Sequence, residues 1–367
     1  MIPWWTPEFA ESALSKINAV LERGFPNEGP LSLELEEYFK SFFKCKHAIL
    51  TTSGTASIFL GLAAVGIKPG EKVAVPDLTF VATASAVRLV GAVPILIDID
   101  PESLTICPKQ LRRLHSIHKF KTVIPVHVSG RSALTSEFMN VVKDLQLTII
   151  EDAAEAFASK DPATGKFLGT VGQIGAFSFS PNKIVTSGQG GLVVTDNDQF
   201  AFNVRNLKDQ GRPIRGTGGD DDHPNIGYNF KYTDLQAALL LSQLENLEKR
   251  IQHLNNTYLE YEMNIKKDQI GKLLQFNIEA GEFPLWPEFK TPRRFELEAL
   301  LQQNGVGFRK IWRPIHTQKA YRDLNREYPN STLASKEILW LPSSFKLALD
   351  DLKVISKILN SSLESSD

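Results

Sequence analysis

A lysine and an aspartate about thirty residues apart carry the most informative chemistry in this sequence. Lys183 follows a short apolar run at residues 176–179 and precedes a glycine-rich turn at residues 188–191. Asp152 ends another apolar run, which begins at residue 148. An amine that forms a Schiff base and a carboxylate that pairs with a pyridinium nitrogen are the two groups that pyridoxal phosphate most needs from a protein. Each residue alone is better explained as a surface lysine or a helix-capping aspartate, but the two together, with a phosphate site upstream, favour the cofactor.

A phosphate site is predicted at the turn formed by residues 51–57. This stretch, TTSGTAS, follows the apolar residues 48–50 and opens a helical pattern over residues 56–65. Small residues where a strand turns into a helix let backbone N–H groups approach an anion, and the helix dipole favours negative charge there. Ser-Gly-Thr also suits an ordinary helix N-cap, so the motif alone is weak. Ser178 or Ser180, just before Lys183, could supply a further hydroxyl.

Short motifs follow one another along nearly the whole chain. They are GFPNEGP (residues 24–30), TSGTAS (52–57), VPDLTF (75–80), IPVH (124–127), EDAAEA (151–156), FSFSPNK (177–183), GYNF (227–230), TDLQ (233–236) and RPIH (313–316). Each motif is modestly specific, whereas their order and spacing together are highly specific. With these motifs in this order, the chain resembles the DegT/DnrJ/StrS group of nucleotide-sugar aminotransferases, which are fold-type I pyridoxal-phosphate enzymes.

The resemblance implies a role for each residue of the predicted cofactor site. Lys183 would form the Schiff base with the cofactor, and Asp152 would pair with its pyridine nitrogen. Phe80 would stack on the cofactor ring, because a flat aromatic face suits a conjugated π-system. The cofactor phosphate would be held by Gly54, Thr55 and Ser178.

The resemblance also implies a second subunit and a substrate site. Asn229 would reach the phosphate bound to the neighbouring subunit, which makes a homodimer part of the active site. His316 and Arg309 would lie near the sugar nucleotide, and Gln189, where relatives usually carry Glu, would complete the substrate site. Lys231 stands where relatives usually carry Arg, so the local hydrogen bonding must differ there.

These roles predict transfer of an amino group from L-glutamate to a keto-sugar linked to a nucleotide, with the keto group at C3 or C4. Lys183 would move a proton between the donor α-carbon and the cofactor, while Asp152 keeps the ring nitrogen protonated. The product would be an amino sugar for lipopolysaccharide or a similar polysaccharide. Two alternatives remain open. One is a sugar dehydratase on the same fold, whose members typically lack the Schiff-base lysine, and the other is a catalytically silent binding or regulatory protein.

Composition excludes several classes of protein. The chain has 367 residues, 41 basic and 42 acidic side chains and a formal net charge of -1, so no strong field attracts nucleic acid or an anionic membrane. Cys45 and Cys107 do not form a metal or disulfide framework, and we expect no metal site. The N-terminus lacks a signal-peptide pattern, and no segment reaches the roughly 20 apolar residues that span a bilayer. We therefore expect a soluble, cytoplasmic enzyme.

Alternating strand and helix patterns must position these residues. Short, mostly apolar runs predict strands at residues 72–75, 94–98, 122–127, 148–151, 176–179 and 192–195. Helical patterns such as residues 79–90 and 132–145 fall between them. This alternation predicts an α/β fold with a mostly parallel central sheet covered by helices and with ligand groups at the strand ends. His127 ends one of these strands and could either approach the cofactor or have a structural role.

A smaller α/β domain is predicted at the C-terminus. Residues 233–254 read as one long amphipathic helix that begins with a TDLQ cap and links the two domains. We place the large cofactor-binding domain at residues 1–245 and the small C-terminal domain at residues 246–367.

Overall fold

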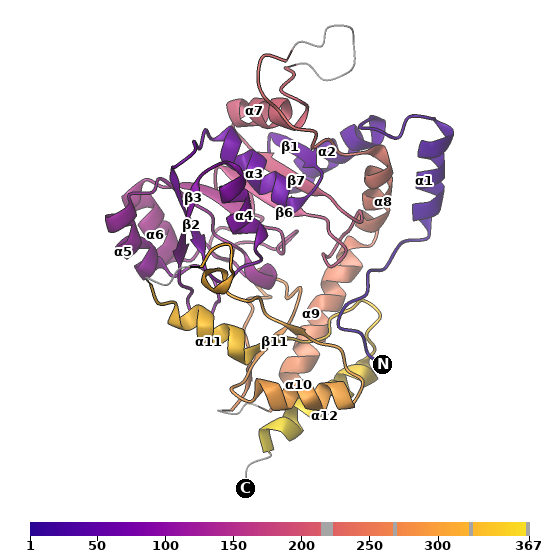
Figure 1. The fold of residues 1–367 in the computed structure, drawn as a ribbon. Coiled ribbons are helices and arrows are strands. Elements are labelled where there is room, and N and C mark those ends of the chain that lie inside the picture. The colour runs from indigo at the N-terminus through magenta and orange to yellow at the C-terminus, as the bar shows by residue number, and fades with distance from the viewer. Residues whose placement is uncertain (214–222, 267–269, 323–325, 365–367) are drawn as a thin grey trace.

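The computed structural model describes residues 1–213, 223–266, 270–322 and 326–364, and within them seven strands form one central sheet (Figure 1). The strands are β1 (His47–Thr51), β2 (Lys72–Pro76), β3 (Val93–Ile97), β4 (Thr122–Val123), β5 (Thr148–Asp152), β6 (Ile174–Ser178) and β7 (Gly191–Thr195). Their order across the sheet is β1-β7-β6-β5-β4-β2-β3. Neighbours pair in parallel except at β7, which is antiparallel to both β6 and β1. The expected mostly parallel sheet is confirmed, and every strand but β7 ends at the same edge.

Five of the six predicted strands match the observed ones within two residues, and the strand predicted over residues 122–127 does not. β4 ends at Val123 because Pro125 has no N–H to donate to a ladder. The chain nevertheless stays beside β5. The N–H of Asp152 donates to the Pro125 carbonyl at 2.9 Å, and the N–H of His127 donates to the Asp152 carbonyl at 3.1 Å.

Alternate residues of the strands enter two cores, one on each face of the sheet. On β1, Ala48 and Leu50 join one core and Ile49 joins the other, because successive strand side chains point to opposite faces. The first core includes α2 (Pro30–Phe43), α5 (Pro108–His118) and α6 (Ser136–Leu145), and the second includes α3 (Gly54–Ala64), α4 (Ala82–Leu89) and α7 (Asp198–Lys208). Burial on both faces explains why these strands are nearly continuous apolar runs.

A second, antiparallel sheet follows in the C-terminal part of the chain. It contains β8 (Lys272–Leu273), β9 (Glu288–Lys290), β10 (Arg309–Lys310) and β11 (Ile338–Trp340), in the order β10-β11-β9-β8. Its core is shared with α9 (Leu247–Asn264), α10 (Arg294–Gln303) and α12 (Leu349–Glu364), while α11 (Pro329–Glu337) leads into β11. We call this sheet and its helices the smaller unit. Figure 1 shows it below the central sheet.

The long helix predicted over residues 233–254 is two helices. The first, α8 (Asp234–Leu244), begins with the capping box expected from the TDLQ motif and packs against α1 (Ser12–Glu22). The helix breaks at Glu245 and Asn246, and α9 then carries the chain toward the smaller unit (Figure 1). Because neither proline nor glycine marks the break, the apolar pattern alone did not reveal it.

The first residues of the chain pack on the smaller unit. Ile2 forms a parallel bridge with Val306, and the carbonyl of Trp4 accepts the N–H of Ser343 at 3.3 Å. The predicted large domain, residues 1–245, therefore contains a segment that packs against residues beyond it. The domain limits themselves stay a prediction.

Two kinds of feature are absent from the described part of the chain. No helix there is both long and apolar enough to cross a bilayer. No cluster of three or more His, Cys, Asp or Glu side chains there could hold a metal ion.

Candidate active site

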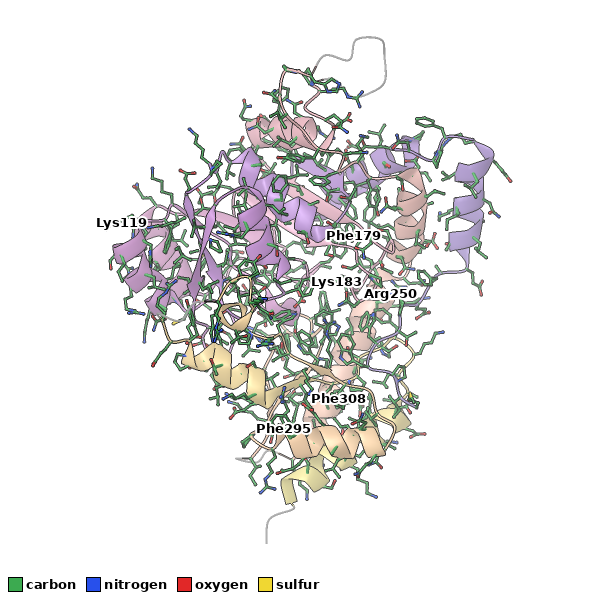
Figure 2. All side chains as sticks on the ribbon, viewed as in Figure 1. Lys119, Phe179, Lys183, Arg250, Phe295 and Phe308 are labelled. Carbon is green, nitrogen blue, oxygen red and sulfur yellow. The ribbon has the colours of Figure 1, made fainter. Side chains whose placement is uncertain are left out.

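The carboxyl ends of five strands meet at a cavity of about 470 Å³. The segments after β1, β2, β4, β5 and β6 line it from the central sheet, and residues of the smaller unit line the other side. In Figure 2, Lys183 lies near the middle of the molecule, between the central sheet and the smaller unit. The cavity is therefore at the sheet edge where α/β folds bind ligands.

Lys183 lies in the loop that joins β6 to β7. Its backbone N–H donates to the carbonyl of Ser180 at 3.1 Å, which makes a tight turn. Trp5, from the first residues of the chain, donates its Nε1–H to the carbonyl of Pro181 at 3.1 Å. The loop that carries the lysine is thus held by its own backbone and by the N-terminal segment.

The amine of Lys183 is enclosed and paired. Its Nζ lies 3.3 Å from Glu155 Oε1 and 4.9 Å from the ring centroid of Trp286. Only 11% of the lysine side chain is exposed. Burial raises the pKa of the Glu155 carboxyl, and the positive charge of Lys183 opposes that shift. The lysine therefore has a defined position inside the cavity.

Asp152 is a buried carboxylate that lines the same cavity. Its Oδ2 accepts the hydroxyl proton of Thr83 at 2.7 Å, and its Oδ1 accepts the N–H of Ala154 at 3.2 Å. Burial raises the pKa of Asp152, while the Thr83 hydrogen bond lowers it. None of the ion pairs in the described part of the chain includes Asp152. A buried carboxylate with no cation within ion-pair distance is costly, so this point suits a ligand that carries a positive charge.

The N-terminus of α3 forms the predicted anion site. Its N-cap residue, Ser53, accepts a backbone N–H at 3.1 Å. The N–H groups of Gly54 and Thr55 precede the first intrahelical hydrogen bond and are available to a ligand. A Cβ on Gly54 would lie 2.8 Å from the Cβ of Ser178, so only glycine lets α3 approach β6 this closely. The hydroxyls of Ser178 and Ser180 lie 2.7 Å apart beside this helix end.

Three further residues predicted for the site line the cavity. Phe80 is 53% exposed, which leaves an aromatic face free for a ligand. The Arg309 guanidinium lies 5.2 Å from the ring centroid of Trp4 and 5.4 Å from that of Trp340. Across the described ranges of the chain no carboxylate pairs with Arg309, so its donors can bind an anion. Gln189 completes the set.

Comparison with known proteins identifies the family. Residues 7–360 match the model of the DegT/DnrJ/EryC1/StrS aminotransferase family. The chain belongs to this family. A GDP-perosamine synthase from Caulobacter vibrioides is 31% identical over 306 residues, which cover 81% of this chain and 80% of that protein.

Solved structures share the fold over the whole chain. A DegT DnrJ EryC1 StrS aminotransferase from Brucella abortus is 28% identical, with a TM-score of 0.88 and coverage of 96% of both chains. The sugar aminotransferase Spr1654 from Streptococcus pneumoniae, in its PMP form, is 21% identical, with a TM-score of 0.92 and coverage of 99% of both chains. At 21% identity, the match to the Streptococcus pneumoniae structure shows a shared fold alone.

This aminotransferase depends on pyridoxal phosphate, and the cavity fits that cofactor. The close approach of Gly54 to Ser178 leaves the end of α3 open to a phosphate. The unpaired, buried Asp152 suits a protonated ring nitrogen, and the exposed face of Phe80 suits a planar ring. The Lys183 amine enters the same space. The individual contacts of these residues with the cofactor stay predictions.

Two predicted site residues lie outside the cavity of their own chain. Asn229 is exposed in the segment before α8. His316 lines a separate hollow, where its Nδ1 lies 2.7 Å from Asp77 Oδ2. His127, weighed as a cofactor contact, does not line the cavity either. It is fully buried, and its Nε2 lies 2.9 Å from Glu151 Oε2, so its role is structural.

Sequence reasoning missed several residues that line the site or fix its groups. Among them are Thr83, Glu155, Trp286 and Trp312. Glu155 stands in the EDAAEA motif three residues after Asp152, so the motif itself is a signal that could have indicated a site residue there. No local signal points to the two tryptophans, because they reach the cavity only through the packing of the smaller unit.

Proposed function

We propose that this aminotransferase moves an amino group from L-glutamate to a nucleotide-linked keto-sugar, with the keto group at C3 or C4. The product would be an amino sugar for lipopolysaccharide or a similar cell-surface polysaccharide. The observation that carries the proposal is one cavity lined by the Lys183 amine, the buried Asp152 carboxylate and the unpaired Arg309 guanidinium. Similarity to a GDP-perosamine synthase supports a nucleotide-linked substrate.

The unpaired guanidinium supports anionic substrates. Arg309 presents a planar fork of N–H donors, and this geometry matches a carboxylate or a phosphate. In the first half-reaction it can bind a carboxylate of glutamate, and in the second a phosphate of the sugar nucleotide. One residue would thus serve two substrates that enter the same cavity in turn.

The chain's own residues supply the acid–base steps. Bound pyridoxal phosphate supplies a carbonyl that takes up the amino group and a conjugated ring that accepts electrons from the donor α-carbon. Asp152 would hold the proton on the ring nitrogen, since a cation there stabilises its buried carboxylate. Nζ of Lys183 would take the proton from the donor α-carbon and give it up in the following step. Trp286 would help exclude water from that nitrogen. Because both half-reactions use these groups, we expect ping-pong kinetics.

The proposed function also includes a homodimer. Asn229 is exposed and lies outside the cavity of its own chain, which supports a contact with the cofactor phosphate of a second copy. Mixing an inactive Lys183→Ala protein with an inactive Asn229→Ala protein tests this. In a mixed dimer one site regains both residues, so activity should return. If the two proteins exchange subunits and stay inactive, the shared site is wrong.

The test of the reaction is a spectrum followed by a product assay. Protein loaded with pyridoxal phosphate should absorb in the visible range, and glutamate should bleach that absorbance. Nucleotide-linked keto-sugars are then added, and amino sugar is measured by mass spectrometry. Lys183→Ala should lose both the absorbance and turnover, whereas Lys143→Ala, exposed on α6, should keep both. Full activity of Lys183→Ala, or loading without any response to glutamate, would contradict the proposal.

A further inference from the structure

Glu155 is a buried carboxylate of the cavity to which the proposed reaction assigns no step. Its Oε1 lies 3.3 Å from Nζ of Lys183, and its Oε2 accepts the backbone N–H of Ser129 at 3.0 Å. Only 6% of the Glu155 side chain is exposed. Because each oxygen has its own partner, one of them faces the lysine in a fixed direction.

Ser129, which fixes Glu155, is itself held by the smaller unit. Its hydroxyl donates to Glu288 at 2.7 Å, and its carbonyl accepts the N–H of Leu285 at 2.9 Å. Its φ is 53°, in the left-handed region that a serine rarely adopts, so the surroundings must hold the turn in place. The position of Glu155 therefore depends on both parts of the fold.

Several charged groups surround the Lys183 amine. The carboxylate of Asp152 lines the same cavity, but it lies beyond ion-pair distance of the amine. Arg309 is a second cation on the cavity wall, and His127 is turned away toward another carboxylate. For the residues that the structure describes, Glu155 is the carboxylate within ion-pair distance of Lys183.

The ion pair stabilises the charges of both Glu155 and Lys183. Burial raises the pKa of the Glu155 carboxyl, which means that an uncompensated negative charge would be unfavourable there. The Lys183 amine is almost as enclosed, so its positive charge also needs a partner. A carboxylate this close is the group that can stabilise the charged nitrogen.

We propose that Glu155 is the counter-ion of Lys183, and that its Oε1 holds Nζ inside the cavity and stabilises positive charge on that nitrogen. Glu155 acts through Lys183 and is therefore a positioning residue. The inference rests on the proposed function only in taking Lys183 as the residue that bonds the cofactor. An opposite charge within about 4–6 Å favours the charged form of a group by about 1–3 pH units.

Glu155→Gln tests the proposal, because glutamine can still accept the Ser129 N–H but carries no charge. In protein loaded with pyridoxal phosphate, the pH midpoint of the change in visible absorbance should fall by about one unit or more. In cofactor-free protein, mass spectrometry can follow acetylation of Lys183 as a function of pH. Its midpoint should also move to lower pH, since the charged amine loses its partner.

Two further variants define the outcome. Glu137→Gln, exposed on α6, should leave both midpoints unchanged. Glu155→Asp keeps the charge but withdraws it by one methylene, so it should lower the midpoints by less than Glu155→Gln does. Unchanged midpoints in a folded Glu155→Gln protein would show that Glu155 only supports the Ser129 turn, and the proposal would be wrong.

The test of Glu155 as the counter-ion of Lys183 does not depend on one variant or on the proposed function. If Glu155→Gln fails to fold, Glu155→Asp decides, because lowered midpoints support the proposal and unchanged midpoints overturn it. The acetylation midpoint involves no amino donor, so it tests the Glu155–Lys183 pair even if glutamate fails to bleach the cofactor. Bleaching without any shift in Glu155→Gln would keep the proposed function and reject the counter-ion.

Discussion

Thr83 fixes the buried carboxylate of the candidate site, so replacing it tests the role of Asp152. Its Oγ1 donates to Asp152 Oδ2 at 2.7 Å and lies 3.0 Å from Oγ1 of Thr79. The single hydroxyl proton of Thr83 goes to the carboxylate, so Thr79 is the donor in the second contact. Thr83→Val keeps the shape of the side chain and removes this charge-assisted hydrogen bond.

The expected effect follows from the strength of that bond. A hydrogen bond to a charged group contributes about 1.5–3 kcal/mol, which corresponds to a factor of about 10 to 100 in an equilibrium constant. The bond favours the ionised form of Asp152, so its loss raises the pKa of this carboxyl further. A protonated carboxyl cannot neutralise a cationic ring nitrogen. Thr83→Val should therefore weaken binding of pyridoxal phosphate by about 10- to 100-fold, most strongly at lower pH.

The assay is a titration of cofactor-free protein with pyridoxal phosphate, followed by visible absorbance at several pH values. The defect of Thr83→Val should shrink as the pH rises, because Asp152 ionises again. Thr83→Ser keeps the hydroxyl and should bind within a few-fold of the unmodified protein. If Thr83→Val binds as tightly as the unmodified protein at every pH, Asp152 does not act as the partner of the ring nitrogen.

Three other substitutions test the geometry of the site. Gly54→Ala should push α3 away from β6 and cost about 1–3 kcal/mol in the free energy of unfolding, measured by denaturant melts, and adding Ser178→Gly should recover part of the loss. Asp152→Asn should raise the free energy of unfolding of cofactor-free protein at neutral pH. Because burial raises the Asp152 pKa, ionisation of Asp152 lowers the stability of the unmodified protein as the pH rises. The stability gain of Asp152→Asn should therefore shrink as the pH falls toward the ordinary Asp pKa, and melts at several pH values measure this change. Trp5→Phe removes the hydrogen bond to the Pro181 carbonyl and should lower kcat while costing about 0.5–1.5 kcal/mol of stability, whereas an unchanged kcat would show that the Lys183 loop does not need this contact.

The central sheet was predictable because its strands carry strong local signals. Burial on both faces makes them short apolar runs, and only the run that contains Pro125 was wrong in extent. The break between α8 and α9 has no such signal, since the residues at Glu245 and Asn246 are compatible with a continuous helix. Trp4 packs on Trp286 and Trp340 of the smaller unit, and Trp5 donates a hydrogen bond to Pro181. These contacts join residues far apart in the chain, and no local pattern encodes them.

The residues of the candidate site also include some that local sequence signals predict and others that they do not. Asp152 is the last residue of β5, and Lys183 and Gly54 lie a few residues beyond the ends of β6 and β1. The parallel strands bring these ends together, so the cavity at their meeting point could be expected. Contributions from the smaller unit could not be expected from spacing, because they depend on how that unit docks. Arg309 was found through the family resemblance, and Trp286 was not found at all.

The charge of Asp152 links the stability of the fold to the binding of its ligand. In the chain alone this carboxylate has hydrogen-bond donors but no cation within ion-pair distance in the described residues, and burial raises its pKa despite the positive charge of Lys183, so its ionised form destabilises the folded state. A cationic ring nitrogen at the same point removes that penalty, and a ligand that binds only the folded state stabilises it. Lys183 differs because Glu155 already compensates its charge. The fold thus pairs Lys183 with Glu155 and leaves the Asp152 charge for the cofactor to neutralise, and the residue that weakens the free protein is the one that should bind the ring nitrogen most strongly.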